Sequence, residues 1–161
     1  MSSGVRGCLA YLEWVGRTFG KGPAASRRDA LRSAMAAIRE HENVISLELL
    51  RGLSAVKGLR IRGITDEARM ACRVPTYSFT LEGHHPRRIC EALDAAGIAA
   101  WDGNYYALEV TRRLGLEGTG GMVRVGAAHY TTAAEVDRLL EVIDSIAAAR
   151  APGRSRATAS S

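Results

Sequence analysis

The sequence has 161 residues, of which 47% are hydrophobic, which is enough apolar material for one core and excludes a chain that is disordered throughout. No apolar run is long enough to span a bilayer, and the first residues lack the charged-then-apolar order of a secretory signal, so we expect a cytoplasmic protein without a membrane partner. The net charge of +5 arises in residues 1–39, which hold seven basic residues against two acidic ones. Without interleaved aromatic residues, this excess indicates solvated helix faces and not a nucleic-acid partner.

The first third of the chain is predicted to form two helices. Residues 4–19 carry apolar side chains at helical spacing, and a segment rich in glycine then interrupts the pattern. Ser26 and Asp29 have the spacing of a capping box and begin a long helix, which we expect to run to about Leu53. Gly58 ends this element.

The middle of the chain alternates strand and helix patterns. Residues 59–64 are predicted to form a half-exposed strand, residues 65–73 a polar loop, and residues 74–81 a strand with one apolar face. A helix begins at Pro86 and is stopped by Gly97, and residues 98–101 form a further short strand.

A helix between two strands is a crossover unit, and the expected fold class is therefore α+β. We expect a small mixed or antiparallel sheet, covered on one face by helices and preceded by the long helix. The C-terminal residues 151–161 are small and polar, cannot bury apolar surface, and are expected to be disordered.

Arg124 is the most suggestive charged residue of the sequence. It follows Met122 and Val123 in a strand pattern, and an arginine among apolar neighbours needs an anionic partner such as a carboxylate or a phosphate. One alternative is that the partner is an internal acid, such as Asp102. A helix then begins at Thr132 with a second capping box.

The turn at residues 103–107, with the sequence Gly-Asn-Tyr-Tyr-Ala, is a weaker candidate site. Its glycine permits a close approach of the backbone, and a predicted helix over residues 108–114 follows with free amide donors. A packed surface turn with two structural tyrosines explains the same pattern. Metal binding is not expected, because the three cysteines and the His84-His85 pair lack ligand spacing.

Several of these segments together resemble one enzyme family. Arg124, Tyr130-Thr131-Thr132 and the Glu-Val-Asp-Arg-Leu segment 135–139 are similar to the C-terminal end of class V aminotransferases and cysteine desulfurases, which use pyridoxal phosphate. The segments Arg73-Val74-Pro75-Thr76 and Tyr11-Leu12-Glu13-Trp14 extend the resemblance over nearly the whole chain.

The resemblance implies the small C-terminal domain of a fold-type I pyridoxal-phosphate enzyme. Residues 1–22 would be a terminal helix and linker that belong to a missing large domain, and residues 23–150 the small domain. It implies that Arg124 binds the α-carboxylate of an amino-acid substrate, with Asn104 and Tyr106 near the mouth of the site.

Two departures limit the activity that the resemblance implies. Tyr106 stands where desulfurases carry the cysteine that accepts sulfur, although Trp101 with the following turn resembles the cysteine desulfurase-like subgroup. The two lysines, Lys21 and Lys57, lie outside the sequence context of the cofactor lysine. No residue of this chain is therefore expected to be catalytic, and none is expected to bind pyridoxal phosphate in the chain alone.

Two hypotheses for function follow. The favoured one is a C-terminal fragment of a pyridoxal-phosphate-dependent enzyme that is inactive alone and acts as a homodimer or with the missing large domain. The alternative is a non-catalytic α+β interaction module that pairs with another chain through the apolar face of residues 5–15, because an uncovered apolar face favours association.

Overall fold

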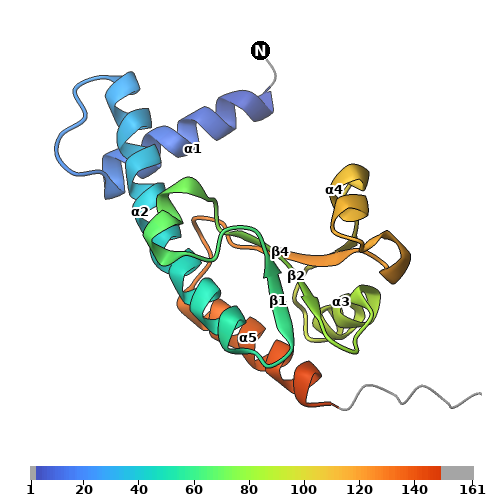
Figure 1. The fold of residues 1–161 in the computed structure, drawn as a ribbon. Helices are drawn as coiled ribbons and strands as arrows, with labels where there is room; N and C mark the ends of the chain where they lie inside the picture. The colour runs from blue at the N-terminus through green and yellow to red at the C-terminus, as the bar shows by residue number, and fades with distance from the viewer. Residues whose placement is uncertain (1–2, 150–161) are drawn as a thin grey trace, which may run out of the picture.

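Residues 3–149 are described by a computed structural model, in which four strands form one sheet and helices cover one of its faces (Figure 1). The predicted disordered tail at residues 151–161 lies outside the described residues. The elements in chain order are α1 (Ser3–Phe19), α2 (Arg27–Ala55), β1 (Leu59–Arg62), the 3-10 helix η1 (Glu67–Cys72), β2 (Thr76–Leu81), α3 (Pro86–Ala95), β3 (Trp101–Gly103), α4 (Leu108–Arg113), the 3-10 helix η2 (Glu117–Thr119), β4 (Met122–Gly126) and α5 (Ala133–Ala148).

The starts of α2 and α5 are fixed by the predicted capping boxes. The Ser26 hydroxyl accepts a hydrogen bond from the Asp29 amide at 3.1 Å, and the Asp29 carboxylate accepts from the Ser26 amide at 3.1 Å. Thr132 and Glu135 make the same reciprocal pair at the start of α5. Both predictions are confirmed.

Within residues 3–149, no helix combines the length and the apolar character that crossing a membrane requires.

The sheet has the strand order β1-β2-β4-β3, and each neighbouring pair is antiparallel. Because β2 and β3 both run antiparallel to β4, they are parallel to each other, and α3 makes the predicted crossover between them. They are not neighbours, since the last strand of the chain, β4, lies between them. The fold class is α+β, as the sequence predicts.

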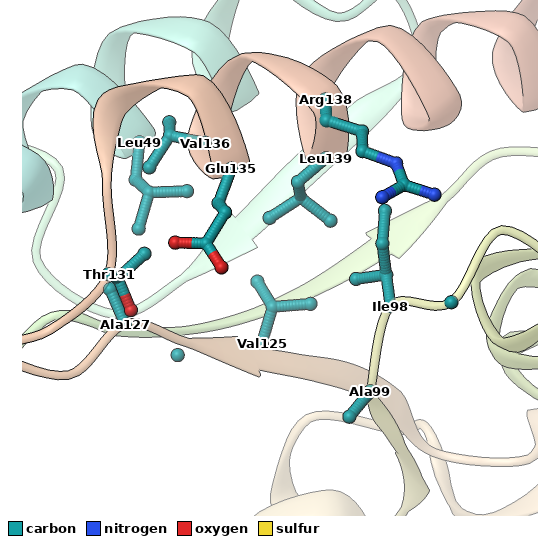
Figure 2. A pocket seen from close by; sticks show the side chains of 12 residues that line it. Leu49, Ile98, Ala99, Val125, Ala127, Thr131, Glu135, Val136, Arg138 and Leu139 are labelled. Carbon is teal, nitrogen blue, oxygen red and sulfur yellow. The ribbon is translucent and has the colours of Figure 1, made fainter.

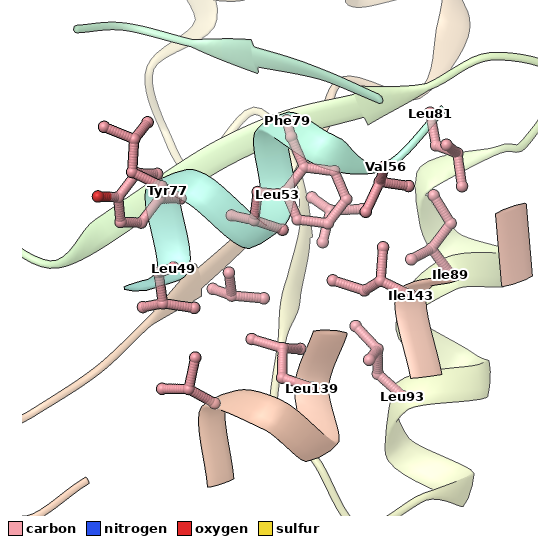
Figure 3. Close-up of a cluster of buried hydrophobic side chains, with 14 of the residues drawn as sticks. Leu49, Leu53, Val56, Tyr77, Phe79, Leu81, Ile89, Leu93, Leu139 and Ile143 are labelled. Carbon is pink, nitrogen blue, oxygen red and sulfur yellow. The ribbon is translucent and has the colours of Figure 1, made fainter. Parts of the chain in front are cut away.

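The core lies between the sheet and the helices α2, α3 and α5. Tyr77, Phe79 and Leu81 alternate along β2 and are buried on the helix side, which confirms the predicted apolar face of this strand (Figure 3). Burying such side chains contributes roughly 1.5 to 3 kcal/mol each. The other buried members of this core are Ile45, Leu49, Leu50, Leu53, Val56, Ile89, Leu93, Val123, Val125, Val136, Leu139 and Ile143.

The first helix packs on the long helix, away from the sheet (Figure 1). The contact is close: a Cβ atom at Gly16 would overlap the backbone carbonyl of Ala30 on α2. The Tyr11 hydroxyl also hydrogen-bonds Nε2 of His129, in the loop after β4, at 2.8 Å. By contrast, Trp14 and Phe19 remain 53% and 62% exposed.

Three predicted segments differ from the structure. The predicted loop 65–73 contains η1, whose start is capped by the Asp66 carboxylate on the Ala68 amide at 2.9 Å. The predicted strand 98–101 is displaced toward the C-terminus, because Ile98 still hydrogen-bonds the end of α3 and pairing with β4 begins only at Trp101. The first strand ends at Arg62, two residues earlier than predicted.

Candidate functional site

Arg124 occupies the middle of β4, on the face of the sheet that points away from the core. Its neighbours Val123 and Val125 are buried on the helix side, so Arg124 faces the opposite way. Ser78 on β2 and Trp101 on β3 lie directly opposite it in the ladder. Residues paired in this manner share a face. The open face of the sheet therefore presents an arginine between a serine and a tryptophan.

The Arg124 guanidinium lies against two aromatic rings. It is 5.2 Å from the centre of the Trp101 ring and 4.8 Å from that of Tyr105, both within the range of a cation–π interaction. In the part of the chain that the structure describes, no carboxylate forms an ion pair with it. Asp102, the internal acid considered above, pairs with Val123 in the ladder and so belongs to the core side of the sheet.

An open depression of about 530 Å³ adjoins Arg124. Trp101 and Thr76 also line it, as do Tyr130 and Thr131 from the loop after β4. Most of the remaining wall is formed by alanine and glycine residues, which lie just before β3 and at the end of β4 and after it. The depression is large enough to admit a small carboxylic acid against the guanidinium.

The other two predicted site residues, Asn104 and Tyr106, lie in the turn that follows β3. The Asn104 side-chain oxygen accepts a hydrogen bond from the Tyr106 amide at 3.1 Å, and its amide nitrogen donates to Glu117 at 3.4 Å. The Tyr106 side chain is 94% exposed. Neither side chain lines the depression, and the residue of this turn that contacts Arg124 is Tyr105.

Tyr105 combines an unusual backbone with a buried hydroxyl. Its φ of 53° lies in the left-handed region, and its hydroxyl is buried without a hydrogen bond of ordinary geometry. Burial is the main cause that raises the pKa of the phenol, and the nearby Cys90 raises it further. Ser78 and Arg124 lower this pKa. Burial also raises the pKa of the Cys90 thiol to about 11. Both groups are therefore neutral near pH 7, and neither offers Arg124 a negative charge.

Glycines hold the turn against β4. A Cβ atom at Gly121, whose φ is 80°, would overlap the backbone carbonyl of Gly103 at the start of the turn. Gly120 likewise leaves no room for a Cβ beside the His85 ring. His85 itself caps α3, because its Nδ1 accepts a hydrogen bond from the Arg87 amide at 3.3 Å. This histidine therefore has a structural contact at the start of α3.

A second, narrower cavity of about 210 Å³ lies between the start of α5 and residues 97–99 (Figure 2). Its polar groups are already engaged: the Glu135 carboxylate completes the capping box, which lowers its pKa, and Arg138 donates to the carbonyl of Ala96. Leu139 and Val125 supply apolar wall. We read this cavity as a packing gap between the helix and the sheet.

The two lysines do not fit a pyridoxal-phosphate site. Lys21 makes an ion pair with Glu40 at 2.8 Å on the exposed surface of the helix pair, and Lys57 is exposed in the turn after α2. Neither lines the depression at Arg124. A cofactor bound as a Schiff base needs a lysine at the reacting centre, and neither Lys21 nor Lys57 lies at this depression.

Trp101 and Tyr105 were missed from the sequence as neighbours of Arg124. The available signal was Trp101, which stands shortly before the two adjacent tyrosines of the turn. The Trp101 contact depends on the register between β3 and β4, which joins it to a residue more than twenty positions later in the chain, and the Tyr105 contact depends on the turn after β3.

Comparisons with known proteins agree with one another. The family model for aminotransferase class-V matches residues 29–139. A probable cysteine desulfurase of Mycobacterium leprae is 36% identical over 110 residues, which are 68% of this chain and 17% of that protein. An aminotransferase-like protein of Gibberella zeae is 34% identical over 112 residues, which are 68% of this chain and 27% of that protein.

The fold has a counterpart among solved structures. A cysteine desulfurase from Thermococcus onnurineus, solved in its apo form, aligns with a TM-score of 0.64 and 23% identity over 75% of this chain and 28% of that one. The chain thus spans less than a third of each of these three proteins. The family match covers both the long helix and the strand that carries Arg124. This chain belongs to the aminotransferase class-V family.

Proposed function

We propose that this chain supplies the site for the α-carboxylate of an amino-acid substrate in a pyridoxal-phosphate-dependent enzyme of the class V family. The observation that carries the proposal is Arg124, a guanidinium in a depression that no carboxylate of residues 3–149 neutralises. A planar guanidinium forms two parallel hydrogen bonds with a carboxylate. The decisive experiment is the substitution of Arg124, with substrate affinity and stability measured together.

The other two candidate residues have lesser roles in this proposal. Asn104 shapes the turn through its bond to the Tyr106 amide, and Tyr106 projects from the turn into solvent, where it can meet a substrate or a neighbouring segment. A phenol cannot carry a persulfide, so we do not propose sulfur transfer through Tyr106. The proposal leaves open transamination and elimination as the reaction.

The cofactor, when bound, supplies the chemistry at the substrate's α-carbon, and its lysine comes from outside this chain's described residues. We propose that a lysine-bearing large domain, or a second subunit in a homodimer, completes the site, with residues 1–22 packing on that domain and residues 23–150 forming the small one. This assembly is proposed to act in the cytoplasm.

Pyridoxal phosphate mixed with the isolated chain is expected to show no specific binding, because both lysines lie away from Arg124. Absorbance after gel filtration measures this directly. An aldimine band that stays with the protein, and disappears in Lys21→Ala or Lys57→Ala, would contradict the expectation and place a cofactor site within this chain.

A second candidate function, an interaction module without catalysis, is favoured by the exposed aromatic side chains of α1. Trp14 and Phe19 stack edge to face at 5.6 Å and remain largely open to solvent. Exposed aromatic clusters of this kind mark interaction surfaces.

If this surface pairs with another copy, the wild-type chain should sediment as a dimer and the double variant Trp14→Ser, Phe19→Ser as a monomer. Val74→Ser is the control, because Val74 is 66% exposed and lies outside α1. A wild-type chain that sediments as a monomer at all concentrations would remove the support for self-association.

A further inference from the structure

The backbone of the turn after β3 is held in an energetically costly conformation. The Ala107 amide donates to the Asn104 carbonyl at 2.7 Å, which closes a four-residue turn. Both central residues, Tyr105 and Tyr106, have positive φ, 53° and 63°. Turns of this type favour asparagine and glycine, and side chains beyond Cβ are strained there. Two adjacent tyrosines in such a turn call for a compensating interaction.

The compensation lies with Tyr105 alone. Tyr106 is 94% exposed, whereas the Tyr105 ring covers Arg124 and its hydroxyl is buried near Ser78 without a hydrogen bond of ordinary geometry. A buried hydroxyl that lacks a well-formed hydrogen bond is unfavourable, so the hydroxyl does not account for the position of this side chain. The ring does, because it lies 4.8 Å from the guanidinium.

Trp101 contacts the same guanidinium from the neighbouring strand, at 5.2 Å. The two rings reach Arg124 from different segments, Trp101 through the β3–β4 register and Tyr105 through the strained turn. Without such contacts, the bonds of an arginine side chain on a sheet surface rotate freely. Fixing them when a ligand binds costs conformational entropy and so reduces affinity.

We propose that Trp101 and Tyr105 are positioning residues that hold the Arg124 guanidinium in the orientation that receives a carboxylate. This rests on the proposed carboxylate site. The rings contact the charged group through their faces and leave the guanidinium N–H donors free of any carboxylate of residues 3–149, so that less motion is lost when the substrate binds. The strained turn is the device that keeps the second ring in place.

The first test observes Arg124 itself in the full chain by nuclear magnetic resonance of arginine side chains. In the wild type, the Arg124 side-chain protons should be shifted upfield by the two rings, and its Nε–H bond should be ordered. Tyr105→Leu and Trp101→Leu should each reduce that shift and raise the mobility. Tyr105→Phe should preserve both signals, and Trp14→Leu on α1 is the matched control for loss of a tryptophan. An Arg124 signal in the wild type without ring-current shift or order would overturn the proposal, whatever the variants do.

The second test measures amino-acid affinity in an assembly that contains the lysine-bearing domain of a relative. Tyr105→Leu should raise KM roughly three- to tenfold, with a smaller change in kcat, and Tyr105→Phe should restore the wild-type value. If Arg124 becomes mobile in Tyr105→Leu while KM stays unchanged, the positioning role is wrong. If Arg124→Lys also leaves KM unchanged, the carboxylate site itself fails, which is a separate result.

Discussion

Phe79→Ala is expected to lower the free energy of unfolding by about 3 to 5 kcal/mol, the usual cost of removing a fully buried phenylalanine. Phe79 lies on β2 between Ile61 of β1 and Val123 of β4, with no exposed surface. Its ring contacts the core formed by α2, α3 and α5 (Figure 3). Removal of the ring leaves a cavity at the point where all these elements meet. Domains of this size are stable by about 5 to 15 kcal/mol, so the loss is a large fraction of the total.

The same substitution at the other phenylalanine of the chain is the matched control. Phe19 is 62% exposed at the end of α1, and Phe19→Ala should change the free energy of unfolding by about 0.5 kcal/mol or less. Urea unfolding followed by circular dichroism measures both variants. Equal losses at the two positions would show that the sheet core does not dominate the stability of the chain.

Local signals predicted the helices and the central strand well. The two capping boxes were readable because each one depends on residues three positions apart. The alternation in β2 was readable because one of its faces is buried and the other is not. These features involve contacts along the chain, or burial that repeats at a fixed period, and a single sequence contains both.

The position of β3 could not be predicted in this way. Ala99 and Ala100 carry no signal for a strand end, and the strand is placed by its pairing with β4, whose residues follow about twenty positions later. The 3-10 helix η1 was missed for a different reason, since six residues are too few to show a helical period.

In the candidate site, too, some residues were predicted from the sequence and others were not. Arg124 was predicted because a charge in an apolar strand stands out in the sequence. Trp101 and Tyr105 were missed because their contacts with Arg124 depend on the strand register and on positive φ at a tyrosine, which is the least expected conformation for that residue.

Arg124→Lys is expected to weaken the binding of an amino-acid substrate about tenfold or more. A lysine offers a single point charge in place of two parallel hydrogen bonds, and hydrogen bonds to charged groups contribute about 1.5 to 3 kcal/mol each. Since 1.4 kcal/mol corresponds to roughly tenfold in affinity, the loss of one bond accounts for the effect. Arg124→Ala should weaken binding further. The α-carboxylate does not itself react, so the change should appear mainly in KM and less in kcat.

The structure also allows a role of Arg124 in substrate binding to be distinguished from a role in the stability of the fold. Within residues 3–149 no carboxylate pairs with Arg124, so its removal leaves no buried acid without a partner. The melting temperature should therefore change little. The measurement combines substrate affinity and melting in the assembly that contains the cofactor lysine, with Arg60→Lys on β1 as the control for an exposed arginine. Lost affinity at unchanged melting is the expected result. A large drop in melting with affinity preserved would instead show that the guanidinium is needed for packing against Trp101 and Tyr105, and the carboxylate site would have to be sought elsewhere.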